Sequence, residues 1–267
     1  MSKTFKVGML AGLAALAYGG SALANIDPTK LGPTTGDIFL NVVDTTNSTS
    51  FLFDTGISQA LFNGSASGTP LNFSTDANWA TFYTAHATDS FLFSVVSSTV
   101  GSGRGATGTV FFTGTTAPTA TVGANIGQAT AIVTGFIGTT TTGAASITSS
   151  TTNSVLLPSG NYWGDPLREG AFSTNLFALA NAVSAAPGTA LAFYSETSSA
   201  LTDTVAAATL ATFAGKWNLN LSTGTLSYSA VPLPAPLVLL LSGLGLMGLV
   251  ARRGKGGASG YAFGAAA

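Results

Sequence analysis

The chain has 267 residues, of which only 7% are charged, and a formal net charge of −1. It contains no cysteine, which excludes disulfides, a thiol nucleophile, an iron–sulfur cluster and the usual structural zinc site. Because basic residues do not outnumber acidic ones, the composition also argues against a nucleic-acid partner.

The N-terminus has the pattern of an export signal. Lys3 and Lys6 form a basic region, an apolar stretch rich in Ala, Gly and Leu follows over 7–20, and small residues stand at Ala22 and Ala24. This order is typical of a secretory signal peptide. We therefore expect residues 1–24 to be removed by signal peptidase after Ala24, and residues 25–230 to form the exported domain.

The segment 25–230 is acidic, unlike the chain as a whole. It holds all ten acidic residues but only four bases, which gives it a formal charge of −6. Such a surface does not favour binding to nucleic acid or to an anionic membrane. Its length fits one all-β domain, whose solubility depends on Ser, Thr and Asn.

Short runs of β-branched and aromatic residues, separated by Gly, Asn, Asp and Ser, predict β-strands. The predicted strands are 37–43, 50–53, 90–96, 109–113, 130–137, 154–157, 190–195, 216–221 and 225–229. The last two alternate between apolar and polar residues and are joined by 222–224, which predicts a hairpin. The Thr/Ser runs 138–142 and 146–153 are expected to be solvated edge or loop segments.

Two stretches predict short helices. Asp76 could cap a helix on which Trp79, Phe82, Tyr83 and His86 fall at helical spacing. Ser173 could cap a second helix that runs as far as residue 183. The expected fold is all-β: a single antiparallel β-sandwich or jelly-roll-like domain with one or two short helices. Its core is expected to contain Phe51, Phe53, Phe91, Phe93, Phe111, Phe112, Phe193 and Trp217.

Two motifs suggest chemistry that their context does not support. Asp54-Thr55-Gly56 matches the aspartic-protease triplet, but that reaction needs a second such carboxylate, and a strand ending in an Asp/Gly turn is the favoured interpretation. The glycines of 103–108 have dinucleotide-binding spacing, but a strand follows them instead of the required helix. We interpret that segment as a hairpin loop.

Each of the remaining candidate sites also has a structural interpretation that we favour over a functional one. His86 is the sole histidine; a catalytic triad would combine it with Asp89 and a distant serine. Asp165, Arg168 and Glu169 form the closest acidic grouping for calcium, although their order favours ion pairing. Tyr162-Trp163 or Trp79 could stack on a sugar, but such residues are more often part of a core. We therefore expect no catalytic residue, cofactor or metal.

The C-terminal segment combines three features in order. An apolar run that predicts a transmembrane helix over 237–251 is followed by Arg252 and Arg253 as a basic membrane stop, which the positive-inside bias places in the cytoplasm. That helix would be about 22 Å long, short for a hydrocarbon core of about 30 Å. Before it lies a prolyl motif made of Val231, Pro232, Leu233, Pro234 and Ala235.

Residues 231–255 closely resemble the PEP-CTERM sorting signal of exported proteins of Gram-negative bacteria, in its Val-Pro-Leu-Pro-Ala variant. The resemblance implies recognition of residues 231–235 by an exosortase, a membrane-embedded Cys transpeptidase-like enzyme. It also implies an inner-membrane-anchored precursor that is later released to the outer surface or the exopolysaccharide matrix. The Gly/Ala-rich tail 256–267 departs from the family pattern, which usually stops soon after the arginines.

The expected function is that of a surface or biofilm-matrix protein without catalysis of its own. Its expected partners are signal peptidase, the exosortase and the inner membrane, with exopolysaccharide as a candidate. The alternative is a carbohydrate-binding module of the same matrix, which would need an exposed aromatic pair. A hydrolase is the third possibility and would need a cleft containing His86 or Asp54.

Overall fold

The computed structural model describes residues 36–62, 70–84, 86–100, 107–142, 154–179 and 182–230. The signal peptide expected at 1–24, the motif 231–235, the helix expected at 237–251, Arg252, Arg253 and the tail 256–267 lie outside these residues. Within the described part of the chain, no helix combines the length and apolar character needed to cross a membrane.

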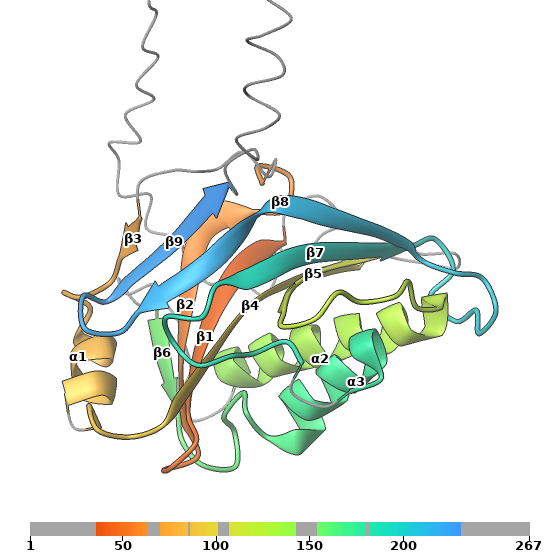
Figure 1. The fold of residues 1–267 in the computed structure, drawn as a ribbon. Coiled ribbons are helices and arrows are strands. Elements are labelled where there is room, and N and C mark those ends of the chain that lie inside the picture. The colour runs from red at the N-terminus through yellow and green to blue at the C-terminus, as the bar shows by residue number, and fades with distance from the viewer. Residues whose placement is uncertain are drawn as a thin grey trace, which may run out of the picture.

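The described strands form one antiparallel sheet that curls into an open half-barrel (Figure 1). Its order is β3-β9-β8-β7-β5-β4-β1-β2-β6. The strands are β1 (Asp37–Asp44), β2 (Thr49–Ser58), β3 (Leu71–Asn72), β4 (Phe91–Val100), β5 (Gly108–Gly114), β6 (Ser154–Leu157), β7 (Leu191–Ser198), β8 (Thr209–Asn220) and β9 (Thr225–Ala230). The all-β antiparallel prediction is confirmed. A sandwich or jelly roll would contain two packed sheets, whereas continuous hydrogen bonding joins these strands into a single sheet.

Eight of the nine predicted strands coincide with strands of the sheet, and β6 has the predicted bounds. The hairpin between β8 and β9 is also present, with Gly224 at a φ of 55° in its turn. The strand predicted at 130–137 is wrong: these residues belong to α2 (Gly123–Thr142). The Thr run 138–142 is likewise the end of this helix, whereas 146–153 lies outside the described residues.

α2 forms because its apolar residues meet the sheet at helical spacing. Ile126, Ala129, Val133 and Phe136 are buried and recur every three or four residues. This places them on one face of a helix, which packs against β4, β5 and β7. The β-branched residues that predicted a strand are thus overridden by tertiary packing.

The two predicted helices are present with different bounds. α1 (Ala77–Thr84) begins as expected, because Asp76 Oδ1 accepts hydrogen bonds from Asn78 N at 2.8 Å and Trp79 N at 3.0 Å. α3 (Ala171–Phe177) instead follows a π-helix, η2 (Pro166–Gly170), which Asp165 caps. Ser173 therefore lies inside α3 instead of capping it, and the helix ends well before residue 183.

The two faces of the sheet carry separate apolar clusters. The inner face of the curl holds Ile38, Leu40 and Val42 of β1, while the outer face holds Phe39 and Val43 of the same strand. α2 and α3 cover the outer face, and α1 adds to the inner cluster (Figure 1). All eight predicted core residues lie in these clusters, with Phe53 only partly buried.

Aromatic contacts close the inner face. The ring centroids of Phe51 on β2 and Phe73 beside β3 are 5.6 Å apart, although these strands lie near opposite ends of the sheet order. Phe62 lies 5.0 Å from Tyr228 and 6.0 Å from Trp217. The curl is thus held by rings that meet across its interior.

Candidate functional site

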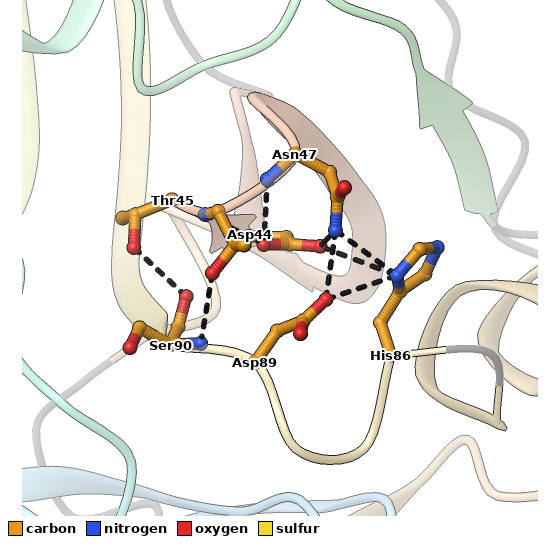
Figure 2. A network of polar contacts seen from close by, with 7 residues as sticks. Asp44, Thr45, Asn47, His86, Asp89 and Ser90 are labelled. Carbon is orange, nitrogen blue, oxygen red and sulfur yellow. Dashed lines mark hydrogen bonds and ion pairs between the residues drawn. The ribbon is translucent and has the colours of Figure 1, made fainter.

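A cluster of polar side chains lies where β1 ends and β4 begins. Asp44 ends β1, and the β1–β2 turn follows it; His86 and Asp89 belong to the loop between α1 and β4. Antiparallel pairing sets Asp44 opposite Phe91, the first residue of β4. The carbonyl of Ser90 accepts hydrogen bonds from both the backbone N and Oγ1 of Thr45, each at 2.9 Å, which ties the turn to the loop (Figure 2).

Asp44 is the buried member of the cluster. Its side chain is 0% exposed, whereas those of His86 and Asp89 are 35% and 20% exposed. Its Oδ1 accepts hydrogen bonds from the backbone of Thr46 at 2.8 Å and of Asn47 at 3.1 Å. This turn orients the carboxylate so that Oδ2 faces the other members.

The amide nitrogen of Asn47 stands at the centre of the cluster (Figure 2). Nδ2 lies 2.7 Å from Asp44 Oδ2, 2.7 Å from Asp89 Oδ2 and 3.0 Å from His86 Nδ1. It has only two hydrogens for these three neighbours. Both hydrogens can go to the carboxylates while His86 Nδ1 donates its own hydrogen to Asp89 Oδ2, 3.0 Å away, which leaves the contact between Nδ2 and Nδ1 without a hydrogen bond.

The cluster has little compensating positive charge. The described residues contain two Lys/Arg side chains, Arg168 and Lys216. Arg168 is engaged elsewhere, because it donates to the carbonyl and side chain of Asn161 and lies over the ring of Phe136. The side chain that accompanies the carboxylates is instead His86, whose Nδ1 lies 3.8 Å from Asp44 Oδ2 and 3.0 Å from Asp89 Oδ2.

The chemistry open to this arrangement follows from its atoms. Two carboxylate oxygens and one imidazole nitrogen lie within 4.8 Å of one another, which is a donor set that could hold a metal ion. Within the described residues, the side chain of His86 contacts two carboxylates and an amide, so this geometry does not assemble a serine triad.

The other motifs found in the sequence have structural roles. Asp54-Thr55-Gly56 lies inside β2, which continues to Ser58; Asp54 is buried and accepts a hydrogen bond from Gly56 N at 2.8 Å. Gly56 has a φ of 68°, so the turn-type geometry is present but the strand does not end there. Residues 101–106 lie outside the described residues, and Gly108 begins β5.

The grouping expected around Arg168 is not an ion-paired site. Asp165 accepts from Leu167 N at 2.8 Å as the cap of η2, and Arg168 binds Asn161. Glu169 is buried, and loss of solvation raises its pKa to about 7, with Ser184 offsetting the shift slightly.

The tryptophans considered for sugar stacking are core residues. Trp79, Trp163 and Trp217 are 3%, 0% and 1% exposed. Trp163 packs against Phe136 with ring centroids 4.9 Å apart, and Trp79 packs against Phe73 at 4.8 Å.

An open depression of about 520 Å³ lies beside α2, η2 and α3. Its lining consists of Gln128, Gly164, Pro166, Gly170, Ala171, Thr174 and Asn175. These residues have no ionisable side chain, and neither His86 nor Asp54 is among them. The depression therefore lacks the groups that a hydrolytic cleft would need.

Sequence analysis identified His86 and Asp89 but missed Asp44 and Asn47. The available signal was an aspartate at the end of a strand followed three residues later by an asparagine, a common turn pattern. Only the pairing of β1 with β4 shows that this turn meets the loop of His86.

Comparison with known protein families, curated proteins and solved structures found no match to this chain.

Proposed function

We propose that this chain is an exported protein of a Gram-negative bacterium, sorted at the inner membrane by residues 231–255 and processed there by an exosortase. It then acts on the outer surface or in the exopolysaccharide matrix, without catalysis of its own. The observation that carries this proposal is the order of three C-terminal features: the motif 231–235, the apolar run 237–251, and Arg252 with Arg253.

The prolines determine the backbone conformation that we expect for the motif. Pro232 and Pro234 lack the backbone donor that a helix interior needs, and each disfavours helical conformation in the preceding residue. They keep residues 231–235 extended at the outer interface, where an enzyme embedded in the membrane can bind them. The arginines then hold the end of the span on the cytoplasmic side.

The described domain is compatible with that role. It has no cysteine and relies on two apolar clusters and a continuous hydrogen-bonded sheet, which need no oxidative step after export. Carbohydrate binding through tryptophan stacking is not favoured, because the three tryptophans are buried. Hydrolysis is not favoured either, because the depression beside α2 contains no ionisable group.

The sorting proposal is tested by replacing both Pro232 and Pro234 with alanine. The helix should then extend through the motif and hide it, so uncleaved precursor should accumulate in the inner membrane. Cell fractionation with intact-mass analysis measures this. The matched control is Pro236→Ala, which removes a proline outside the motif and should leave processing unchanged. Normal processing of the double variant would refute the proposal.

Export is tested separately from processing of the C-terminal motif. N-terminal sequencing of the processed protein should find Asn25 as its first residue, because Ala22 and Ala24 provide the small side chains that signal peptidase needs. Material that begins at Met1 and remains in the cytoplasm would contradict export, whatever the fate of the C-terminal motif.

A further inference from the structure

We propose that Asp44, His86, Asp89 and Asn47 form a binding site for one divalent transition-metal cation of the Zn²⁺ type. Asp44 and Asn47 come from the β1–β2 turn, while His86 and Asp89 come from the loop before β4 (Figure 2). The site would therefore be made by the fold and not by one contiguous motif. It is independent of the sorting role.

The spacing of the donor atoms fits such an ion. Zn²⁺ binds nitrogen and oxygen at about 2.0–2.2 Å, so neighbouring ligands in a tetrahedral site stand roughly 3.3–3.6 Å apart. His86 Nδ1 lies 3.0 Å from Asp89 Oδ2 and 3.8 Å from Asp44 Oδ2, on either side of that range. Shifts of a few tenths of an ångström would bring these two distances into that range. The two carboxylate oxygens, which with Nδ1 all lie within 4.8 Å of one another, would also draw together around the ion.

Electrostatics supply an argument that does not depend on these distances. Asp44 is fully buried and has a second carboxylate, Asp89, close by, and within the described part of the chain neither carboxylate forms an ion pair with a Lys or Arg. Buried charges in proteins are normally paired or bound to a metal. A divalent cation would balance both carboxylates and leave neutral His86 as the third ligand.

Without an ion, Asn47 holds the side chains of the cluster in place. Its Nδ2 group stands between the three ligand atoms, where it donates to the two carboxylates and lies 3.0 Å from His86 Nδ1. An arriving cation would displace this group, and rotation of the amide would present Oδ1 as a fourth ligand. The partial exposure of His86 and Asp89 leaves a path from solvent.

The donor types select the class of ion. Ca²⁺ and Mg²⁺ prefer sites made entirely of oxygen, and Ca²⁺ needs six to eight ligands. An imidazole nitrogen with two carboxylates instead suits Zn²⁺ and its transition-metal neighbours. Because the bound form needs a deprotonated imidazole nitrogen, acidification should weaken binding.

The test uses isothermal titration calorimetry of the full chain, purified in detergent without a histidine tag and stripped with a chelator. We expect one Zn²⁺ per chain and much weaker binding of Ca²⁺. His86→Ala and Asp89→Asn should each weaken Zn²⁺ binding by more than about tenfold, since even residues beyond the ligands contribute about 10–100-fold. Circular dichroism checks that both variants remain folded.

The matched control is Asp203→Asn. Asp203 Oδ1 accepts hydrogen bonds from Val205 N at 2.7 Å and Ala206 N at 2.9 Å, the same turn pattern as Asp44, but no histidine accompanies it. This variant should bind Zn²⁺ as the unmodified chain does. Absence of Zn²⁺ binding, equal loss in the control, unchanged affinity in folded His86→Ala, or a preference for Ca²⁺ would each overturn the proposal.

A gain-of-affinity variant provides a second test. Asn47→Asp places a third carboxylate where the amide now bridges the cluster. Without metal, repulsion should lower the melting temperature; with Zn²⁺, the affinity should rise and the melting temperature should recover as ion binding stabilises the folded state. Weaker Zn²⁺ binding by this variant would contradict the proposed role of Asn47.

Discussion

The inner and outer faces of the curled sheet each bury an apolar cluster, but they do so in different ways. The inner face is closed by rings in direct contact, such as Phe193 and Trp217, whose centroids are 5.7 Å apart. The outer face, beneath α2 and α3, also buries the amide of Asn41, the hydroxyl of Ser94 and the carboxyl of Glu196. Packing should therefore dominate the stability of the inner face, whereas the outer face should also respond to pH and to polar substitutions.

The largest effect is expected from Trp217→Ala on the inner face. Trp217 is 1% exposed and also packs against Tyr228, with ring centroids 5.0 Å apart. Removing such a ring typically costs about 3–5 kcal/mol, a large share of the roughly 5–15 kcal/mol that holds a domain together. Urea unfolding measures the change. Leu167→Ala, at a side chain that is 83% exposed, is the control and should be nearly neutral.

Glu169→Gln should change how stability depends on pH. Burial raises the pKa of Glu169 from 4.5 to about 7, so the folded chain keeps a proton that the unfolded chain releases. The contribution of Glu169 to the free energy of unfolding should therefore be fully present below about pH 4.5 and fall by about 3 kcal/mol as the pH rises through 7. Glutamine cannot titrate, so the variant should lose this decline.

Unfolding measured between pH 4.5 and 8 tests this expectation. Asp203→Asn is a suitable control, because backbone hydrogen bonds from Ala206 and Val205 lower the pKa of Asp203, so its contribution to stability changes with pH only below this range. A slope that persists unchanged in Glu169→Gln would show that another group causes it.

Two serine substitutions on the outer face should have opposite signs. Ser94 Oγ is buried without a hydrogen-bond partner among the described residues, so Ser94→Ala should stabilise the protein by about 1 kcal/mol. Ser50 Oγ accepts a hydrogen bond from Trp163 N at 3.0 Å, so Ser50→Ala should destabilise it by about 1–2 kcal/mol. Chemical denaturation of both variants measures the difference, and two changes of equal sign would contradict the assigned roles.

The smallest effect is expected at the polar cluster in the absence of metal. His86 is 35% exposed, and its contacts are at the surface of the cluster. His86→Ala should therefore change the free energy of unfolding by less than about 1 kcal/mol in chelator. A much larger decrease in the free energy of unfolding would mean that the cluster stabilises the fold where β1 ends and β4 begins.

Particular elements show how far the sequence could predict the structure. The strands were recognisable because β-branched and aromatic residues alternate with polar ones, and α1 because Asp76 precedes aromatic residues at helical spacing. α2 was missed because 130–137 is rich in β-branched residues, while the burial that makes it a helix depends on β4, β5 and β7. α3 was misplaced because Ser173 uses its hydroxyl to bind Leu179 O and Ala182 N instead of capping.

By itself, the sequence determined the local features: the alternating strands, the turn before β9 and the cap of α1, each set by neighbouring residues. It also carries the terminal sorting pattern, which remains a prediction. Only the tertiary structure decided that the strands form one curled sheet, that 123–142 is a helix, and that Asp44 and Asn47 meet His86 and Asp89. The reason is physical: these outcomes depend on tertiary contacts such as those of α2 with β4, β5 and β7 and of Asn47 with His86 and Asp89, which local propensity does not encode.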